Sequence, residues 1–173
     1  MPLVKTLPGG GLTAPVADWP VLAPDADVPA EGAVLVPLAT WLAAPDSLKE
    51  RADVGVWLAP DDDLAAFADA GAAPAVIAIR FAAFTDGRGY SLARLLRDRL
   101  GHRGELRAVG DVLVDQARFL ARSGFDAFQV ADGTDLDRFA AALGRYTVVY
   151  QPAADGAAPV AALRHSSPGR AAE

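Results

Sequence analysis

Six short apolar runs recur along the chain at a nearly constant interval, and this rhythm constrains the fold more than any other feature of the sequence. The runs begin near residues 34, 54, 76, 106, 126 and 147, so successive starts are 20, 22, 30, 20 and 21 residues apart. Segments with apolar residues at helical spacing lie between them. This alternation is typical of repeated βα units with right-handed crossovers and a parallel sheet.

The pattern therefore predicts an α/β fold in three layers, with a mainly parallel sheet of five to six strands. Six units are too few for a closed eight-stranded barrel, so the sheet is expected to be open or a partial barrel. The expected strands are 33–36, 54–58, 75–81, 105–109, 126–130 and 146–150. The expected helices are 38–51 with a break at Pro45, one capped by Asp61–Asp63, 91–100, 112–123, and one capped within 134–137.

The length of 173 residues suits one domain with a sizeable core. Residues 1–30 are rich in Pro, Gly and Asp and are expected to be an irregular lead-in, with room for a short strand or hairpin near 3–6 and 12–16. Residues 31–165 are expected to form the α/β domain, and 166–173 a frayed tail.

The composition excludes several chemistries. Cysteine is absent, which excludes disulfides, thiolate catalysis and cysteine-based metal sites. No apolar stretch approaches the roughly 18 residues that span a bilayer, and no export signal is visible at the N-terminus, so no membrane association and a cytoplasmic location are expected. The two histidines, His102 and His165, are expected in exposed positions and support no catalytic triad or metal site.

The net charge of −6 is unevenly distributed. Residues 1–75 carry three basic and eleven acidic side chains, whereas residues 80–122 carry nine arginines and five acidic side chains. A globally acidic protein is a poor nucleic-acid binder, but a local concentration of arginine suits a small anion or an acidic patch on a partner. Equally, Arg94, Arg97 and Arg99 would simply solvate one helix.

The single long interval between strands holds the segment Phe84–Ser91, whose sequence is Phe-Thr-Asp-Gly-Arg-Gly-Tyr-Ser. A strand, a glycine-rich loop and a helix start bring backbone N–H groups and a helix dipole toward one point, which favours an anion. Gly87 and Gly89 could allow positive φ and close approach to a ligand, and Arg88 offers a forked donor to an oxyanion. Alternatively, Asp86 and Gly87 form a tight turn, Arg88 pairs with Asp86 or Asp111, and Ser91 caps the helix.

Polar segments at 60–63, 85–91, 110–116 and 132–135 each follow a predicted strand and are expected to meet at the carboxyl edge of the sheet. Arg107 lies inside a predicted strand and needs a buried partner if it faces inward, for which Asp111 is the obvious candidate. Asp111 and Asp115 could share a helix face and bind a divalent cation, or could serve as N-cap and first-turn charge. The candidate anion-binding or docking residues are Thr85, Asp86, Gly87, Arg88, Gly89, Tyr90, Ser91, Arg107 and Asp111.

Several segments together resemble a known bacterial family. They are 84–91, 93–97, 104–113, Asp115-Gln116, 124–128, 37–42, 55–58 and Tyr150-Gln151. The chain resembles family 934 of the domains of unknown function, whose members are often labelled as oxidoreductases involved in sulfite reduction and sit beside genes for the sulfite reductase haemoprotein. Two positions depart from the family pattern: Ala82 replaces a common Pro, and Ser123 replaces a common Cys. Ser123 indicates that this position is structural.

The resemblance implies an accessory protein of assimilatory sulfite reduction, which docks on the reductase haemoprotein or its electron donor, or hands over a small oxyanion. The alternative is a stand-alone enzyme that acts on a phosphorylated or sulfated metabolite at the Arg88 loop. The residues show no flavin or nicotinamide motif, so a colourless protein without a cofactor or metal is expected. The family label names no catalytic residues that the sequence could inherit.

Overall fold

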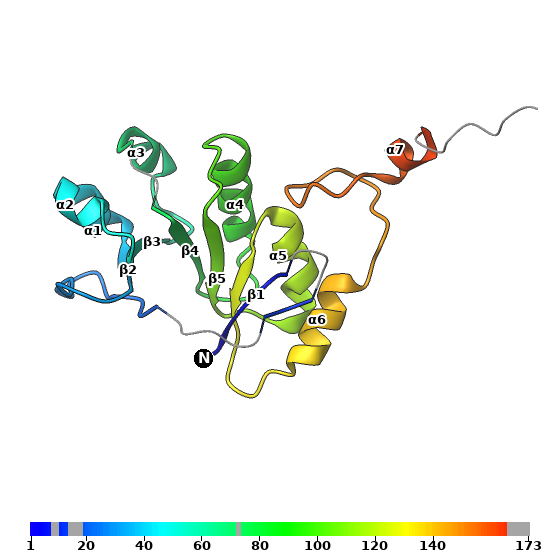
Figure 1. Ribbon diagram of the computed structural model, residues 1–173, viewed down its shortest axis with the longest axis horizontal. Helices are drawn as coiled ribbons and strands as arrows, with labels where there is room; N and C mark the ends of the chain where they lie inside the picture. The colour runs from blue at the N-terminus through cyan, green and yellow to red at the C-terminus, as the bar shows by residue number, and fades with distance from the viewer. Residues whose placement is uncertain (8–10, 14–18, 72–73, 166–173) are drawn as a thin grey trace, which may run out of the picture.

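The computed structural model describes residues 1–7, 11–13, 19–71 and 74–165. They form one open six-stranded sheet in the order β1-β6-β5-β4-β3-β2, flanked by helices (Figure 1). Strands β2 to β6 are mutually parallel and lie in sequence order, and β1 is antiparallel to β6. The strands are β1 Leu3–Lys5, β2 Val34–Pro37, β3 Val54–Leu58, β4 Val76–Phe81, β5 Glu105–Gly110 and β6 Ala127–Gln129. The predicted α/β class and mainly parallel sheet are confirmed.

The helices between the strands lie close to the predicted segments, whereas α7 was not predicted. They are α1 Leu38–Ala43, α2 Asp46–Lys49, α3 Leu64–Asp69, α4 Arg88–Asp98, the 3-10 turn η1 Val114–Gln116, α5 Ala117–Ser123, α6 Leu136–Gly144 and α7 Val160–His165. Pro45 separates α1 from α2, as its missing N–H requires. The carboxylates of Asp63 and Asp135 cap α3 and α6 by accepting backbone N–H groups. None of the helices in the described part of the chain is long and apolar enough to cross a membrane.

The helices cover one face of the sheet only, so the expectation of three layers is wrong. The larger apolar cluster joins that face to side chains of five helices, among them Trp41, Phe67, Leu96 and Phe139. The smaller cluster lies on the opposite face and, among the described residues, contains no helical side chain; Trp19 from the N-terminal segment packs on it. Parallel neighbours joined in sequence order by right-handed crossovers place every helix on the same side.

The sixth strand is the second difference from the prediction. Residues 146–150 form no strand in the sheet, and Val149 makes only an isolated bridge with Pro159. The edge of β6 is taken by β1, whose Leu3 and Val4 are fully buried. The alternating apolar pattern of 146–150 instead leaves Tyr146, Val148 and Tyr150 exposed and buries Val149. The short strand expected near residues 3–6 is therefore part of the sheet, and the residues expected as a tail, 166–173, lie outside the described ones.

Gly110, the last residue of β5, pairs with Phe81, the last residue of β4, at the carboxyl ends of the two central strands. It has a φ of +94°, and a Cβ built there would stand 2.3 Å from the carbonyl oxygen of Phe81. A larger residue here would be strained by the positive φ and would clash with Phe81 unless the two strands moved apart.

We expect Gly110→Ala to lower the free energy of unfolding by at least about 1–3 kcal/mol, because strain in the left-handed region adds to the clash with the backbone. Gly87→Ala is the matched control, since Gly87 has φ −79° and open space around its Cβ position. Urea unfolding of both variants measures the difference. Equal stability of the two would contradict the assigned geometry.

Candidate functional site

Two loops at the carboxyl edge of the sheet are joined by hydrogen bonds. The backbone N–H of Phe84 donates to Oδ2 of Asp111 at 2.9 Å, and Nε2 of Gln116 donates to the carbonyl oxygen of Phe84 at 2.8 Å. Gln116 is 8% exposed and also accepts the N–H of Leu113 at 3.0 Å. The loop after β4 and the loop after β5 therefore form one unit, which we call the loop cluster and define as residues 82–88 and 110–116.

Arg88 and Asp86 form an ion pair within the loop cluster, with Nη2 2.7 Å from Oδ2. Asp86 also accepts the backbone N–H of Arg88 at 3.1 Å, which starts α4 three residues earlier than predicted. Hydrogen bonds from Arg88 lower the pKa of Asp86, and the carboxylate raises the pKa of Arg88. Of the two partners considered for Arg88, the structure shows Asp86, and Ser91 lies inside the helix rather than at its cap.

The two loop glycines do not have the expected roles. Gly87 and Gly89 lack positive φ. Gly89 is buried, and a Cβ there would lie 2.7 Å from the ring of Phe81, so its small size serves packing between α4 and β4 rather than approach to a ligand. Thr85 lies with Gly87 in the loop cluster.

Of the other polar loops that were expected at this edge, one lies near the loop cluster and another pairs elsewhere. Asp61, after β3, is close enough to Arg88 to raise its pKa further. Tyr90 is half-buried near Asp115. Its burial raises its pKa, and the negative charge of Asp115 raises this pKa further. Asp132, in contrast, pairs with the N-terminal amine of Met1 at 3.1 Å. Among the described residues no group of three or more His, Cys, Asp or Glu side chains could hold a metal ion.

Arg107 is buried at 2% exposure, but its partner is not Asp111, whose carboxylate is engaged with Phe84. The Nε of Arg107 donates to Glu105, and its guanidinium lies 4.7 Å from the ring centroid of Trp19. Glu105 also binds Lys5 of β1. The expected pairing with Asp111 is wrong because residues 107 and 105 share one face of β5, whereas Asp111 lies beyond the strand end.

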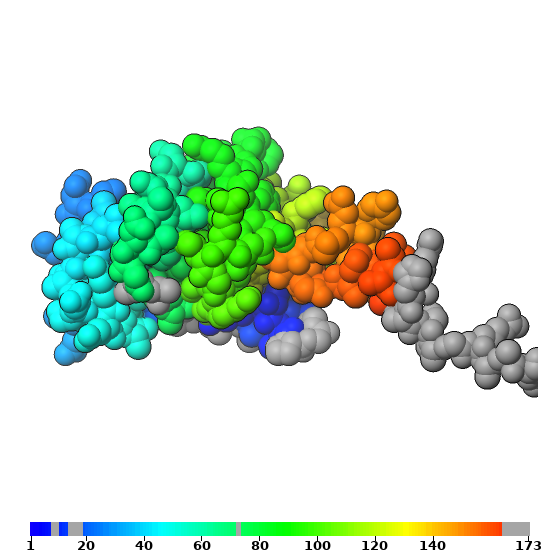
Figure 2. All heavy atoms as spheres, turned by 90° about the horizontal axis from the view of Figure 1, so that it is seen from above, coloured from blue at the N-terminus to red at the C-terminus, as the bar shows by residue number. Residues whose placement is uncertain are grey.

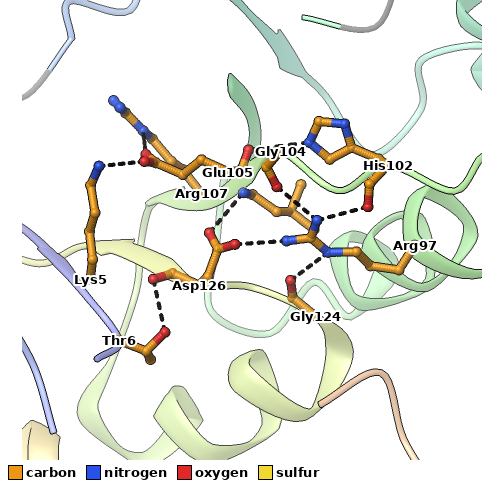
Figure 3. Close-up of polar contacts among 10 residues, drawn as sticks. Lys5, Thr6, Arg97, His102, Gly104, Glu105, Arg107, Gly124 and Asp126 are labelled. Atoms are coloured by element: carbon orange, nitrogen blue, oxygen red, sulfur yellow. Dashed lines mark hydrogen bonds and ion pairs between the residues drawn. The ribbon is translucent and has the colours of Figure 1, made fainter. Parts of the chain in front are cut away.

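Arg97 of α4 is the centre of a network of polar contacts (Figure 3). Its guanidinium pairs with Asp126 at 2.9 Å and donates to three backbone carbonyls. The carbonyl acceptors are His102 at 2.9 Å, Gly104 at 2.8 Å and Gly124 at 2.9 Å. The other carboxylate oxygen of Asp126 accepts the N–H of Leu106 at 2.8 Å, and burial raises the pKa of Asp126. Arg97 is thus a structural residue and does not merely solvate its helix.

His102 is buried at 6% exposure, which contradicts the expectation of an exposed loop residue. Its carbonyl is held by Arg97, and its ring lies 3.4 Å from the carbonyl oxygen of Glu105 through Nε2. Burial lowers the pKa of His102, and the positive charge of Arg97 acts in the same direction. The side chain of His165 lies outside the described set.

A groove lies on the outer side of the helical layer, where the sequence indicated no site. It has a volume of about 650 Å³ and is formed by η1, α5, α6 and residues 145–151. Its side chains are arginine, aromatic and aliphatic, with one aspartate and one glutamine. No signal in the sequence pointed to it, because the exposure of Phe119, Tyr146 and Tyr150 as neighbours on one surface is visible only in the structure.

The architecture defines a class: a small α/β protein with one layer of helices, a hydrogen-bonded loop cluster at the carboxyl edge and an open groove on its helical side. The sequence profile of a family described as bacterial protein of unknown function (DUF934) matches residues 55–161. The chain belongs to this family. No curated protein and no solved structure matches the chain.

We expect Arg97→Ala to lower the free energy of unfolding by about 3–5 kcal/mol, because it leaves Asp126 and three carbonyls without their partner in a mostly buried position. Arg94→Ala is the control: Arg94 forms an exposed ion pair with Asp98 on the same helix and should cost less than about 1 kcal/mol. Chemical denaturation of both variants tests this, and similar losses would refute the structural role of Arg97.

The buried ring of His102 should make the fold sensitive to acid. Its pKa is lower in the folded chain than its ordinary value of 6.5, so the unfolded chain takes up the proton first. The stabilisation is complete above pH 6.5 and decreases as the pH falls below that value. We expect the melting temperature of the wild type to fall between pH 7 and 5 more steeply than that of His102→Gln. Parallel slopes would show that His102 contributes nothing to the acid sensitivity.

Proposed function

We propose that the protein is an accessory protein of assimilatory sulfite reduction that binds another protein of that process through the loop cluster. The observation that carries the proposal is a fixed backbone with exposed side chains. Hydrogen bonds with Asp111 and Gln116 hold the backbone of the loop cluster. Phe84 is 52% exposed, and the side chain of Arg88 is 61% exposed. A rigid support that presents an aromatic ring and an arginine is typical of a protein-binding hot spot.

The same contacts argue against a free oxyanion as the ligand of this loop. Asp86 already occupies the forked donor of Arg88, and Asp61 adds a second negative charge nearby. Asp111 adds a third carboxylate to the same edge. A small anion would have to displace Asp86 and would meet repulsion from the remaining carboxylates. A partner protein, in contrast, can place opposite charges against both Arg88 and Asp86.

The link to sulfite reduction rests on the label that the sequence resemblance carries, since the description of the matched family names no function. The docking role is supported by the way the fold uses its polar side chains: Gln116 and Asp111 both bind the backbone of Phe84 within the loop cluster. The expected partners are the sulfite reductase haemoprotein and its electron donor.

We expect Arg88→Ala to fold with a melting temperature close to that of the wild type, because the ion pair with Asp86 is exposed. Its affinity for the sulfite reductase haemoprotein should fall at least about tenfold, as is usual for an arginine at the centre of an interface. Co-purification and surface plasmon resonance with the haemoprotein measure this, and Arg94→Ala serves as the control. Wild-type protein that binds neither the haemoprotein nor its donor, or binds sulfite in calorimetry, would refute the proposal.

A further inference from the structure

We infer that the groove between α5, α6 and residues 145–151 binds an acidic segment of a partner protein that carries aromatic or aliphatic side chains. The groove is a second binding surface, and the inference does not depend on the partner's place in sulfite reduction. It stands on three properties of the groove: its charge, its exposed apolar side chains and its shape.

The charge of the groove is opposite to that of the whole chain. Four arginines line it, against one acidic residue, Asp115, in a protein of net charge −6. They stand in two rows: Arg118 and Arg122 are one turn apart on α5, and Arg138 lies in the first turn of α6 with Arg145 at its C-cap. This arrangement attracts a negatively charged partner over the length of both helices.

The two rows differ in how their guanidinium groups are used. Arg118 donates to the carbonyl oxygen of Leu143, and Arg122 pairs with Asp155 at 3.1 Å, so these two bind the chain's own backbone and C-terminal segment. Arg138 and Arg145 are exposed and form no ion pair within the described part of the chain. Their charges are therefore available to carboxylates of a partner, for which a guanidinium is the best-matched donor.

Apolar side chains lie beside these charges. Phe119 is 69% exposed, Tyr146 61%, Val148 52% and Tyr150 84%. The alanines at 141 and 142 of α6 line the groove between the larger side chains. Exposed aromatic residues over small ones form pockets that accept apolar side chains from a partner, and arginine, tyrosine and phenylalanine are the residues enriched at protein interfaces.

The shape fits a chain segment better than a nucleic acid or an enclosed small molecule. Residues 114 to 122 rise by about 12 Å at 1.5 Å per residue, which is the length of about four residues of extended chain. The volume of about 650 Å³ holds a few side chains. In Figure 2 the C-terminal segment, in orange, lies toward one end of the described molecule, and residues of the acidic N-terminal half form the other end.

The test uses the full chain and a fluorescein-labelled peptide, Glu-Glu-Phe-Glu-Glu-Leu-Glu-Glu, in fluorescence anisotropy. We expect binding at micromolar concentrations that weakens with salt and falls at least about tenfold in the double variant Arg138→Ala, Arg145→Ala. The double variant Arg99→Ala, Arg103→Ala is the matched control, because it removes the same charge from exposed positions outside the groove.

Two further arms separate the apolar from the charged contribution. Phe119→Ser with Tyr150→Ser should also weaken binding, and the peptide with Ser in place of Phe and Leu should bind more weakly than the original. The inference is overturned if the wild type does not bind the peptide, or if the control variant loses as much affinity as the groove variant. It is also overturned by tighter binding of single-stranded oligothymidine, or by a dimer in sedimentation that the groove variants dissociate.

Discussion

The position of Arg97 at the amino edge of the sheet is the constraint on which the rest of the fold depends. One guanidinium joins the end of α4 to the approach to β5 and to the turn between α5 and β6. Asp126, which pairs with Arg97, also accepts the backbone N–H of Leu106. The neighbouring ion pair of Lys5 with Glu105 attaches β1 to the same edge. Polar atoms that would otherwise be buried without partners are satisfied by a single residue, so this edge contributes to the stability of the fold.

The strand order has a second consequence. Because β2 to β6 follow one another without reversal, the sheet has no switch point, and the crevice in which open α/β sheets usually bind ligands is not formed. The two surfaces proposed for binding are the loop cluster at the carboxyl edge and the groove formed by η1, α5, α6 and residues 145–151.

The strands and helices that were predicted correctly depend on local patterns. The five parallel strands are buried apolar runs, and Asp63, Asp135 and Gly124 end or begin helices through their own backbone or side-chain geometry. The failures involve competition between distant segments. Residues 146–150 have strand-like alternation, but β1 takes the edge of β6. In the candidate site, the pairing of Arg88 with Asp86 was foreseen because the two are near neighbours, whereas the contact of Arg107 with Trp19 spans most of the chain.

The sequence by itself determined the α/β class, the mainly parallel sheet, the approximate positions of the helices between the strands and the family, because apolar periodicity, capping residues and motifs are properties of short segments. Only the tertiary structure decided that the helices form one layer, that His102 and Arg97 are buried, and that Arg138 and Arg145 face the same groove as Tyr150. The physical reason is that burial and charge pairing depend on which segments meet in space. A solvent-exposed arginine and a buried one are identical in the sequence, and only the packing around them separates a structural residue from one available to a partner.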